Sequence, residues 1–121
     1  MRVYVCDDSP EHRALMRAVL ADVPDVEVVG EAGEGSACLV GIENTDADVL
    51  LLDLRMPGMD GWEALERLAE REDAPRVLVM SSSPEHEVED RVRAAGADFL
   101  RKGASPEAVR DAIRRVASEP Q

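Results

Sequence analysis

Five polar side chains stand at the ends of short apolar runs, and together they could bind and transfer a phosphoryl group. They belong to Asp7, Asp8, Asp53, Ser81 and Lys102. Clustered carboxylates repel one another, and Mg²⁺, which prefers oxygen ligands, relieves that repulsion. A carboxylate can attack phosphorus to give an aspartyl phosphate, while an ammonium group and a hydroxyl can contact the phosphoryl oxygens. The set is chemically complete for reversible phosphorylation of Asp53, with Mg²⁺ as the cofactor.

These side chains can meet only if the apolar runs before them are neighbouring strands. The runs alternate with helical patterns along the whole sequence. This alternation predicts an α/β fold, a doubly wound (βα)5 arrangement in which helices cover both faces of a five-stranded parallel sheet. The functional groups of such a sheet gather at the carboxyl ends of its strands. The expected strands are Val3–Cys6, Val26–Glu31, Asp48–Leu52, Val77–Met80 and Phe99–Leu100.

Capping and turn residues mark where helices and loops begin. Asp8-Ser9-Pro10 combines a capping residue with a proline in the first turn, and therefore predicts the start of a helix. Pro57-Gly58 predicts a loop after the third strand. A helix over Ser36–Glu43 is only weakly indicated, because Gly41 interrupts it.

The composition indicates one acidic domain. The 121 residues suffice for a single core, with residues 1–117 as the domain and residues 118–121 as a flexible tail. The net charge of −12 repels nucleic-acid phosphates and anionic lipid, so neither direct nucleic-acid binding by this domain nor membrane binding is expected. No apolar run is long enough for a membrane span, and Asp7 and Asp8 interrupt the stretch that a signal peptide would need. We expect a cytoplasmic protein.

The spacing of the cysteines and histidines indicates no functional role for them. Cys6 and Cys38 form neither a disulfide framework nor a zinc pattern, and are expected to be reduced, partly buried thiols. His12 and His86 fall on expected polar helix surfaces, so a role as metal ligand or phosphodonor is not favoured. Trp62 is expected to be a partly buried packing residue.

The motifs resemble those of the receiver domain of two-component response regulators. The matching stretches are V-Y-V-C-D-D-S-P at the start, L-L-D-L-R-M-P-G-M-D-G around Asp53, V-L-V-M-S at Ser81 and G-A-D-F-L-R-K at Lys102. Each is moderately specific alone, and all four in this order, over essentially the whole chain, are strongly specific. The resemblance implies the strand order 2-1-3-4-5, for which this family is a standard example.

The resemblance also implies the chemistry of the site. Asp53 matches the phosphoacceptor, which takes a phosphoryl group from the phosphohistidine of a sensor histidine kinase in a reaction that the domain partly catalyses itself. Asp7 and Asp8 match the acidic pair that holds Mg²⁺, together with Asp53 and the backbone carbonyl of Arg55. Lys102 matches the lysine that contacts the phosphate.

Two further positions match the switch of this family. Ser81 matches the switch hydroxyl, and Phe99 matches the aromatic residue that turns inward when the hydroxyl moves toward the phosphate. The face formed by the fourth helix, fifth strand and fifth helix then changes its preference for partners, a phosphorylation-dependent homodimer included. From the residues alone, any of Ser81–Ser83 could instead stabilise a turn, and Phe99 could be an ordinary core residue.

Some features depart from the family pattern. Gly103 follows the lysine where many receivers have proline. A cis bond there would cost about 2.5–4 kcal/mol, so a trans bond is expected. The segment from Gly96 to Lys102 is one residue shorter than the pattern. Arg55 is a bulky cation beside the phosphorylation site, and we hypothesise that it tunes how fast water removes the phosphoryl group.

Other interpretations of the same residues remain open. Asp7-Asp8 alone could cap a helix, and Asp53 alone could start a turn. A receiver-like module that signals without phosphate is a second function, although the intact acidic set argues against it. A Mg²⁺ phosphohydrolase of the haloacid-dehalogenase kind is a third, but that class needs D-x-D after the first strand. Beyond its own phosphorylation and dephosphorylation, the chain is therefore not expected to be an enzyme.

The output is left open by the sequence. The stretches V-E-V-V-G-E-A and K-G-A-S-P-E-A-V resemble receivers that precede a helix-turn-helix DNA-binding domain, which favours transcription regulation. The stretches V-V-G-E-A and M-S-S-S also resemble receivers fused to a chemotaxis methylesterase. The expected partners are a sensor kinase and an output domain or protein.

Overall fold

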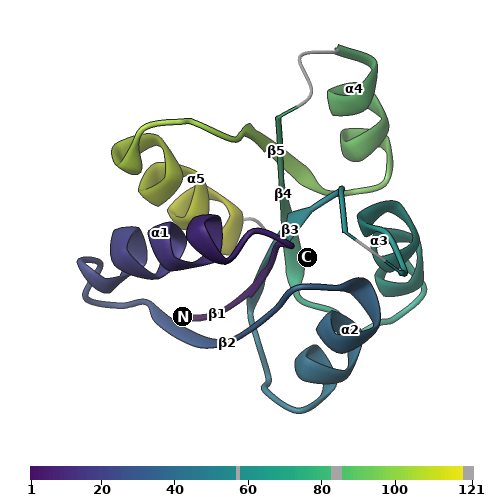
Figure 1. Cartoon of the computed structure of the whole chain (residues 1–121), viewed down its shortest axis with the longest axis horizontal. Coiled ribbons are helices and arrows are strands. Elements are labelled where there is room, and N and C mark those ends of the chain that lie inside the picture. The colour runs from purple at the N-terminus through teal and green to yellow at the C-terminus, as the bar shows by residue number, and fades with distance from the viewer. Residues whose placement is uncertain (57, 83–85, 119–121) are drawn as a thin grey trace.

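A parallel five-stranded sheet forms the centre of the computed structural model, which describes residues 1–56, 58–82 and 86–118 (Figure 1). Its strands lie in the order β2-β1-β3-β4-β5, and every neighbouring pair is parallel. The expected fold and strand order are therefore confirmed. The strands are β1 (Arg2–Cys6), β2 (Glu27–Ala32), β3 (Val49–Asp53), β4 (Arg76–Ser81) and β5 (Asp98–Arg101). The helices are α1 (Pro10–Ala21), α2 (Gly35–Glu43), α3 (Gly61–Ala69), α4 (His86–Ala94) and α5 (Pro106–Ser118).

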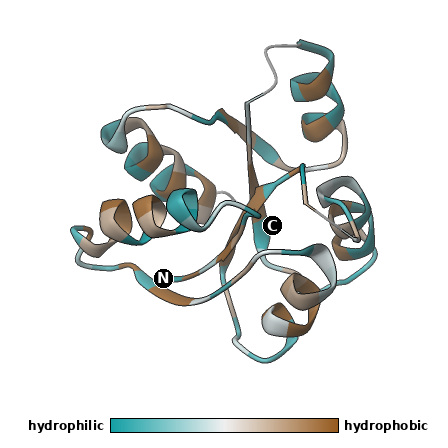
Figure 2. Cartoon of the chain, in the orientation of Figure 1, coloured by the Kyte–Doolittle hydropathy of each residue, from teal (hydrophilic) through white to brown (hydrophobic). Residues whose placement is uncertain are grey.

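The sheet divides the hydrophobic core into two parts. Helices α1 and α5 lie on one face, and α2 and α3 lie on the other (Figure 1). Side chains alternate along β3, so Leu51 joins the core against α1 and α5, while Leu50 and Leu52 join the core against α2 and α3. All five residues of β3 are buried, as expected for a central parallel strand. Figure 2 accordingly shows the strands mostly in the colour of hydrophobic residues.

The weakly indicated second helix is present, and packing explains its glycine. Gly41 lies inside α2, where an added Cβ would come within 2.0 Å of the Tyr4 hydroxyl oxygen. Gly41 therefore lets α2 lie close to β1. From the sequence pattern alone, the same glycine was expected to interrupt the helix.

The expectation of two reduced thiols is wrong. Cys6 at the end of β1 and Cys38 in α2 are joined by a disulfide, with Cα atoms 6.0 Å apart and both side chains buried. The two residues are 32 positions apart in sequence, so only the packing of α2 against β1 brings them within bonding reach.

The remaining structural expectations concern the ends and loops of the chain. Helix α5 runs to Ser118, and residues 119–121 of the expected tail lie outside the described residues. Pro57 of the expected Pro57-Gly58 loop also lies outside them. The described part has no cis peptide bond, in agreement with the expectation for Gly103, whose positive φ of 90° suits glycine. None of the helices in the described ranges is long and apolar enough to cross a membrane.

Candidate functional site

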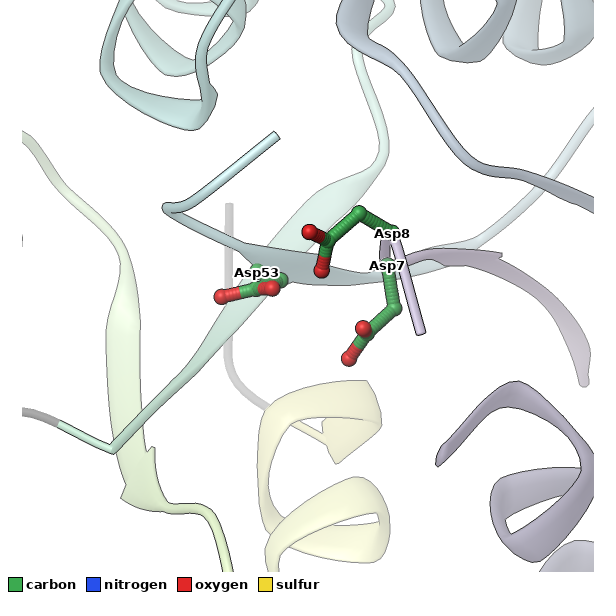
Figure 3. Close-up of side chains that lie close together, drawn as sticks. All are labelled: Asp7, Asp8 and Asp53. Atoms are coloured by element: carbon green, nitrogen blue, oxygen red, sulfur yellow. The ribbon is translucent and has the colours of Figure 1, made fainter. Parts of the chain in front are cut away.

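Three carboxylates meet at the carboxyl-terminal edge of the sheet (Figure 3). Asp53 ends β3, and Asp7 and Asp8 directly follow β1. One carboxylate oxygen from each residue lies within 4.8 Å of those of the other two. Asp7 and Asp53 are 3% and 5% exposed, whereas Asp8 is exposed. Because buried like charges repel, this all-oxygen cluster is suited to bind a hard cation.

Strand register and one glycine bring the three residues together. In the β1–β3 ladder Cys6 pairs with Leu52, so both strands end at the same level. After β3 the chain returns closely upon itself, because the backbone N–H of Gly61 donates to the carbonyl of Leu54 at 3.0 Å. A Cβ on Gly61 would lie 2.4 Å from the Asp53 carbonyl oxygen, so only glycine allows the start of α3 to approach the site.

Lys102 supplies the positive charge of the site. Its Nζ lies 2.9 Å from Asp7 Oδ2 and 3.1 Å from Asp53 Oδ2. The backbone N–H of Lys102 donates to the Ser81 carbonyl at 3.0 Å, which fixes the lysine to the end of β4. Burial alone would lower the pKa of Lys102, but the hydrogen bonds to Asp7 and Asp53 outweigh it and raise that pKa above its usual value. The ammonium group therefore stays charged between the two buried carboxylates.

The environment of Asp53 opposes its negative charge. Burial raises the pKa of the Asp53 carboxyl above its usual value, and the nearby Asp7 charge adds to this effect. The backbone N–H of Arg55, 3.2 Å from Oδ1, and the Lys102 ammonium act in the opposite direction without cancelling it. An added cation or a covalent modification at this carboxylate would relieve the unfavourable burial of charge.

Both oxygens of the Asp7 carboxylate have hydrogen-bond partners. Oδ1 accepts from the backbone N–H of Ser9 at 2.9 Å, and Oδ2 lies 2.6 Å from Nδ1 of His12 as well as 2.9 Å from Lys102. Ser9 caps α1 itself, since its Oγ accepts from the backbone N–H of His12 at 3.1 Å. The interpretation of Asp7-Asp8 as a capping pair is therefore wrong.

His12 is the contact that sequence reasoning missed. It was expected on a polar helix surface, but its side chain is only 15% exposed and lies against Asp7. The available signal was its position in the first turn of α1, because helical side chains lean toward the helix N-terminus and here toward the site. His86, by contrast, is exposed as expected.

The expected switch residues lie close to the same edge. Ser81 ends β4 and is 5% exposed, whereas Ser82 is exposed and Ser83 lies outside the described residues. Phe99 on β5 pairs with Val79 and is buried in the core.

Arg55 and Trp62, which the sequence also singled out, are not members of the carboxylate cluster. Arg55 is exposed, and its backbone N–H donates to Asp53 Oδ1 at 3.2 Å. Trp62 is partly buried as expected, and the Arg91 guanidinium lies 3.9 Å from the centre of its ring.

Comparison with known proteins decides the family. The family model described as "Response regulator receiver domain" matches residues 3–114. The chain belongs to this family. Among curated relatives, this receiver is 34% identical over 117 residues to the nitrate/nitrite response regulator protein NarL of Escherichia coli K12, covering 96% of this chain and 54% of that protein. It is 46% identical over 85 residues to protein-glutamate methylesterase/protein-glutamine glutaminase 5 of Myxococcus xanthus, covering 70% of this chain and 24% of that protein.

Solved receiver structures agree with the family and with the fold. The signal receiver domain of the putative response regulator NarL from Mycobacterium tuberculosis is 36% identical with a TM-score of 0.92, covering 98% of this chain and 97% of that chain. The response regulator domain of Thermotoga maritima CheB is 27% identical with a TM-score of 0.90, covering 100% and 98% of the two chains. The receiver spans about half the length of its NarL relative. The family resemblance of the motifs is thus confirmed, and the chain is a receiver domain of the two-component signalling type.

Proposed function

We propose that Asp53 is the phosphoacceptor of this receiver and that Mg²⁺ is its cofactor. One observation carries the proposal: the buried Asp53 carboxylate lies 3.1 Å from the Lys102 ammonium and within ligand distance of Asp7 and Asp8. In the described part of the chain this is the one group of three residues with that arrangement. It combines a nucleophile, a cation and oxygen ligands for a metal at one point.

In the proposed reaction a carboxylate oxygen of Asp53 attacks the phosphorus of a kinase phosphohistidine. The new O–P bond forms as the P–N bond breaks, and the electron pair returns to the imidazole, which takes up a proton from solvent. Lys102 is placed to contact a phosphoryl oxygen, since its ammonium already lies against Asp53. Bound Mg²⁺, held by Asp7, Asp8, Asp53 and the Arg55 carbonyl, would supply charge neutralisation for the phosphoryl oxygens.

The proposed signal is a change of the surface formed by α4, β5 and α5. The Ser81 hydroxyl would donate to the phosphoryl group, and the position of Phe99 would follow that movement. Val92 is the single buried residue of α4, so little buried contact holds this helix in place. This supports the proposal that α4 changes its position on phosphorylation. The altered surface would act on an output domain, DNA-binding or methylesterase, or on a second copy of this domain.

Further parts of the proposal follow from the relatives and the sequence. We infer a cytoplasmic protein whose residues 1–117 are the receiver unit and whose phosphodonor is a sensor histidine kinase. The lengths of the relatives support an output domain as the partner, because the NarL relative is about twice as long as the matched region.

The test is chemical phosphorylation followed by intact mass measurement. With acetyl phosphate or phosphoramidate and Mg²⁺, the wild-type protein should gain one phosphoryl group, and a chelator should prevent the gain. Asp53→Ala should not be labelled, whereas Asp60→Asn, which keeps a capping oxygen at the neighbouring start of α3, should be labelled normally. Labelling of Asp53→Ala would identify another nucleophile. Absence of labelling in the wild type with every donor would favour a module that signals without phosphate.

A further inference from the structure

His12 is connected to the phosphorylation site through a continuous series of side-chain contacts. Its Nδ1 lies 2.6 Å from Asp7 Oδ2, and the Lys102 ammonium lies 2.9 Å from the same oxygen. Lys102 in turn lies 3.1 Å from Asp53 Oδ2. The side chains are largely removed from solvent, with exposed fractions of 15% for His12, 4% for Asp7, 20% for Lys102 and 5% for Asp53.

The contact assigns the proton on the imidazole ring. An ionised carboxylate only accepts hydrogen bonds, so Nδ1 of His12 must donate to Asp7. Nε2 is buried and has no hydrogen-bond partner among the residues that the structure describes. The ring therefore carries a proton on Nδ1 and points this donor at the acidic cluster.

We propose that His12 is a positioning residue of the receiver, which orients the Asp7 carboxylate for metal binding and, through it, orients Lys102. The inference rests on the proposed function. Asp7 receives the Ser9 N–H on Oδ1 and the His12 and Lys102 donors on Oδ2, so its carboxylate cannot rotate without losing a hydrogen bond. Charge-assisted hydrogen bonds of this kind are the strong ones. Partners that hold a metal-binding carboxylate in place are typically worth about 10–100-fold in metal affinity or activity.

A simple packing role makes a different prediction. His12 lines a small void together with Met16, Leu51 and Met80, so its ring also fills space in the core against α1. If filling were its only role, an apolar side chain of similar size would replace it without effect on the metal. A positioning role instead requires an N–H donor at the place of Nδ1.

Three substitutions separate the two roles. His12→Asn places an amide nitrogen where Nδ1 lies, His12→Gln places its amide one bond further out, and His12→Leu fills the void without any donor. Mg²⁺ binding is measured by calorimetry in the absence of a phosphodonor, and the rate of labelling by acetyl phosphate is measured at saturating Mg²⁺. The Leu and Gln variants should bind Mg²⁺ about 10-fold more weakly than wild type, and the Asn variant should stay close to wild type.

The same experiment contains the outcomes that would overturn the proposal. Equal Mg²⁺ affinity in all four proteins, or an equal loss in the Asn and Leu variants, contradicts positioning by Nδ1–H. Thermal unfolding without Mg²⁺ establishes which variants fold, and if the Leu variant does not, the comparison of Asn with Gln decides. In the metal-free wild type, nitrogen NMR should detect a His12 ring protonated at Nδ1 and protected from exchange. Protonation at Nε2 alone overturns the proposal, whereas a wild type that fails to bind Mg²⁺ or to be labelled counts against the proposed function.

Discussion

Removing the Cys6–Cys38 disulfide should lower the free energy of unfolding by about 3–4 kcal/mol. The bond joins residues 32 positions apart, so it restricts a long loop of the unfolded chain. With about 32 residues in the loop, the chain-entropy relation gives about 3.7 kcal/mol at 25 °C. A domain of this size is typically stable by about 5–15 kcal/mol, so the change is large but should leave the domain folded.

The folded state should tolerate the loss of the bond well. Both cysteines are almost fully buried, between the end of β1 and helix α2. Free thiols pack as small hydrophobic groups, so reduction leaves these side chains in place and removes little apolar contact. The effect should therefore arise mainly in the unfolded chain, which becomes more extended when the bond is absent.

The assay is urea unfolding followed by circular dichroism, with and without a reductant. Reduced wild type and the double variant Cys6→Ala, Cys38→Ala should unfold at lower urea than oxidised wild type. The dependence on urea should also steepen, because a larger unfolded chain exposes more surface. The reductant should change nothing in the double variant, which serves as the control. Identical unfolding midpoints for oxidised and reduced wild type would refute the reasoning, as would two freely alkylated thiols in the denatured, unreduced protein.

Three further predictions concern the carboxylate cluster and the arginine beside it. Asp53→Asn should raise the free energy of unfolding at neutral pH, because it removes a buried charge whose carboxyl pKa is raised. In wild type the folded state binds the Asp53 proton more tightly than the unfolded chain does. Wild-type stability should therefore fall as pH rises from 3.8, the ordinary carboxyl pKa, through the raised pKa of Asp53. Urea unfolding as a function of pH checks this, and an equal pH slope in Asp53→Asn would contradict it. Mg²⁺ at ten times its Kd should stabilise wild type by about 1.4 kcal/mol in thermal unfolding, and Asp8→Asn, altered at an exposed position, should lose most of that gain. Arg55→Ala should change the lifetime of the phosphorylated protein, and equal lifetimes by timed mass measurement would dismiss a role for this exposed cation.

The sequence by itself determined the alternation of strands and helices, the parallel sheet and the edge where the acidic residues meet, whereas the order of the strands came from the family resemblance. Alternating apolar runs and helical patterns leave few other arrangements, and parallel strands bring their carboxyl ends to one side. Asp7 and Asp53 needed no further information, because each directly follows such a strand or ends it. The start of α1 could equally be predicted from Asp8-Ser9-Pro10, because capping is a local interaction between neighbours in sequence.

Only the tertiary structure decided which helix side chains reach the sheet. The Cys6–Cys38 bond, the contact of His12 with Asp7 and the space that Gly41 leaves for Tyr4 all depend on how a helix is placed and rotated against a strand. Hydrophobic periodicity specifies which stripe of a helix is buried, but a single polar contact depends on shifts of an ångström or less. For this reason the three clustered carboxylates could be named from the sequence, and the histidine that contacts one of them could not.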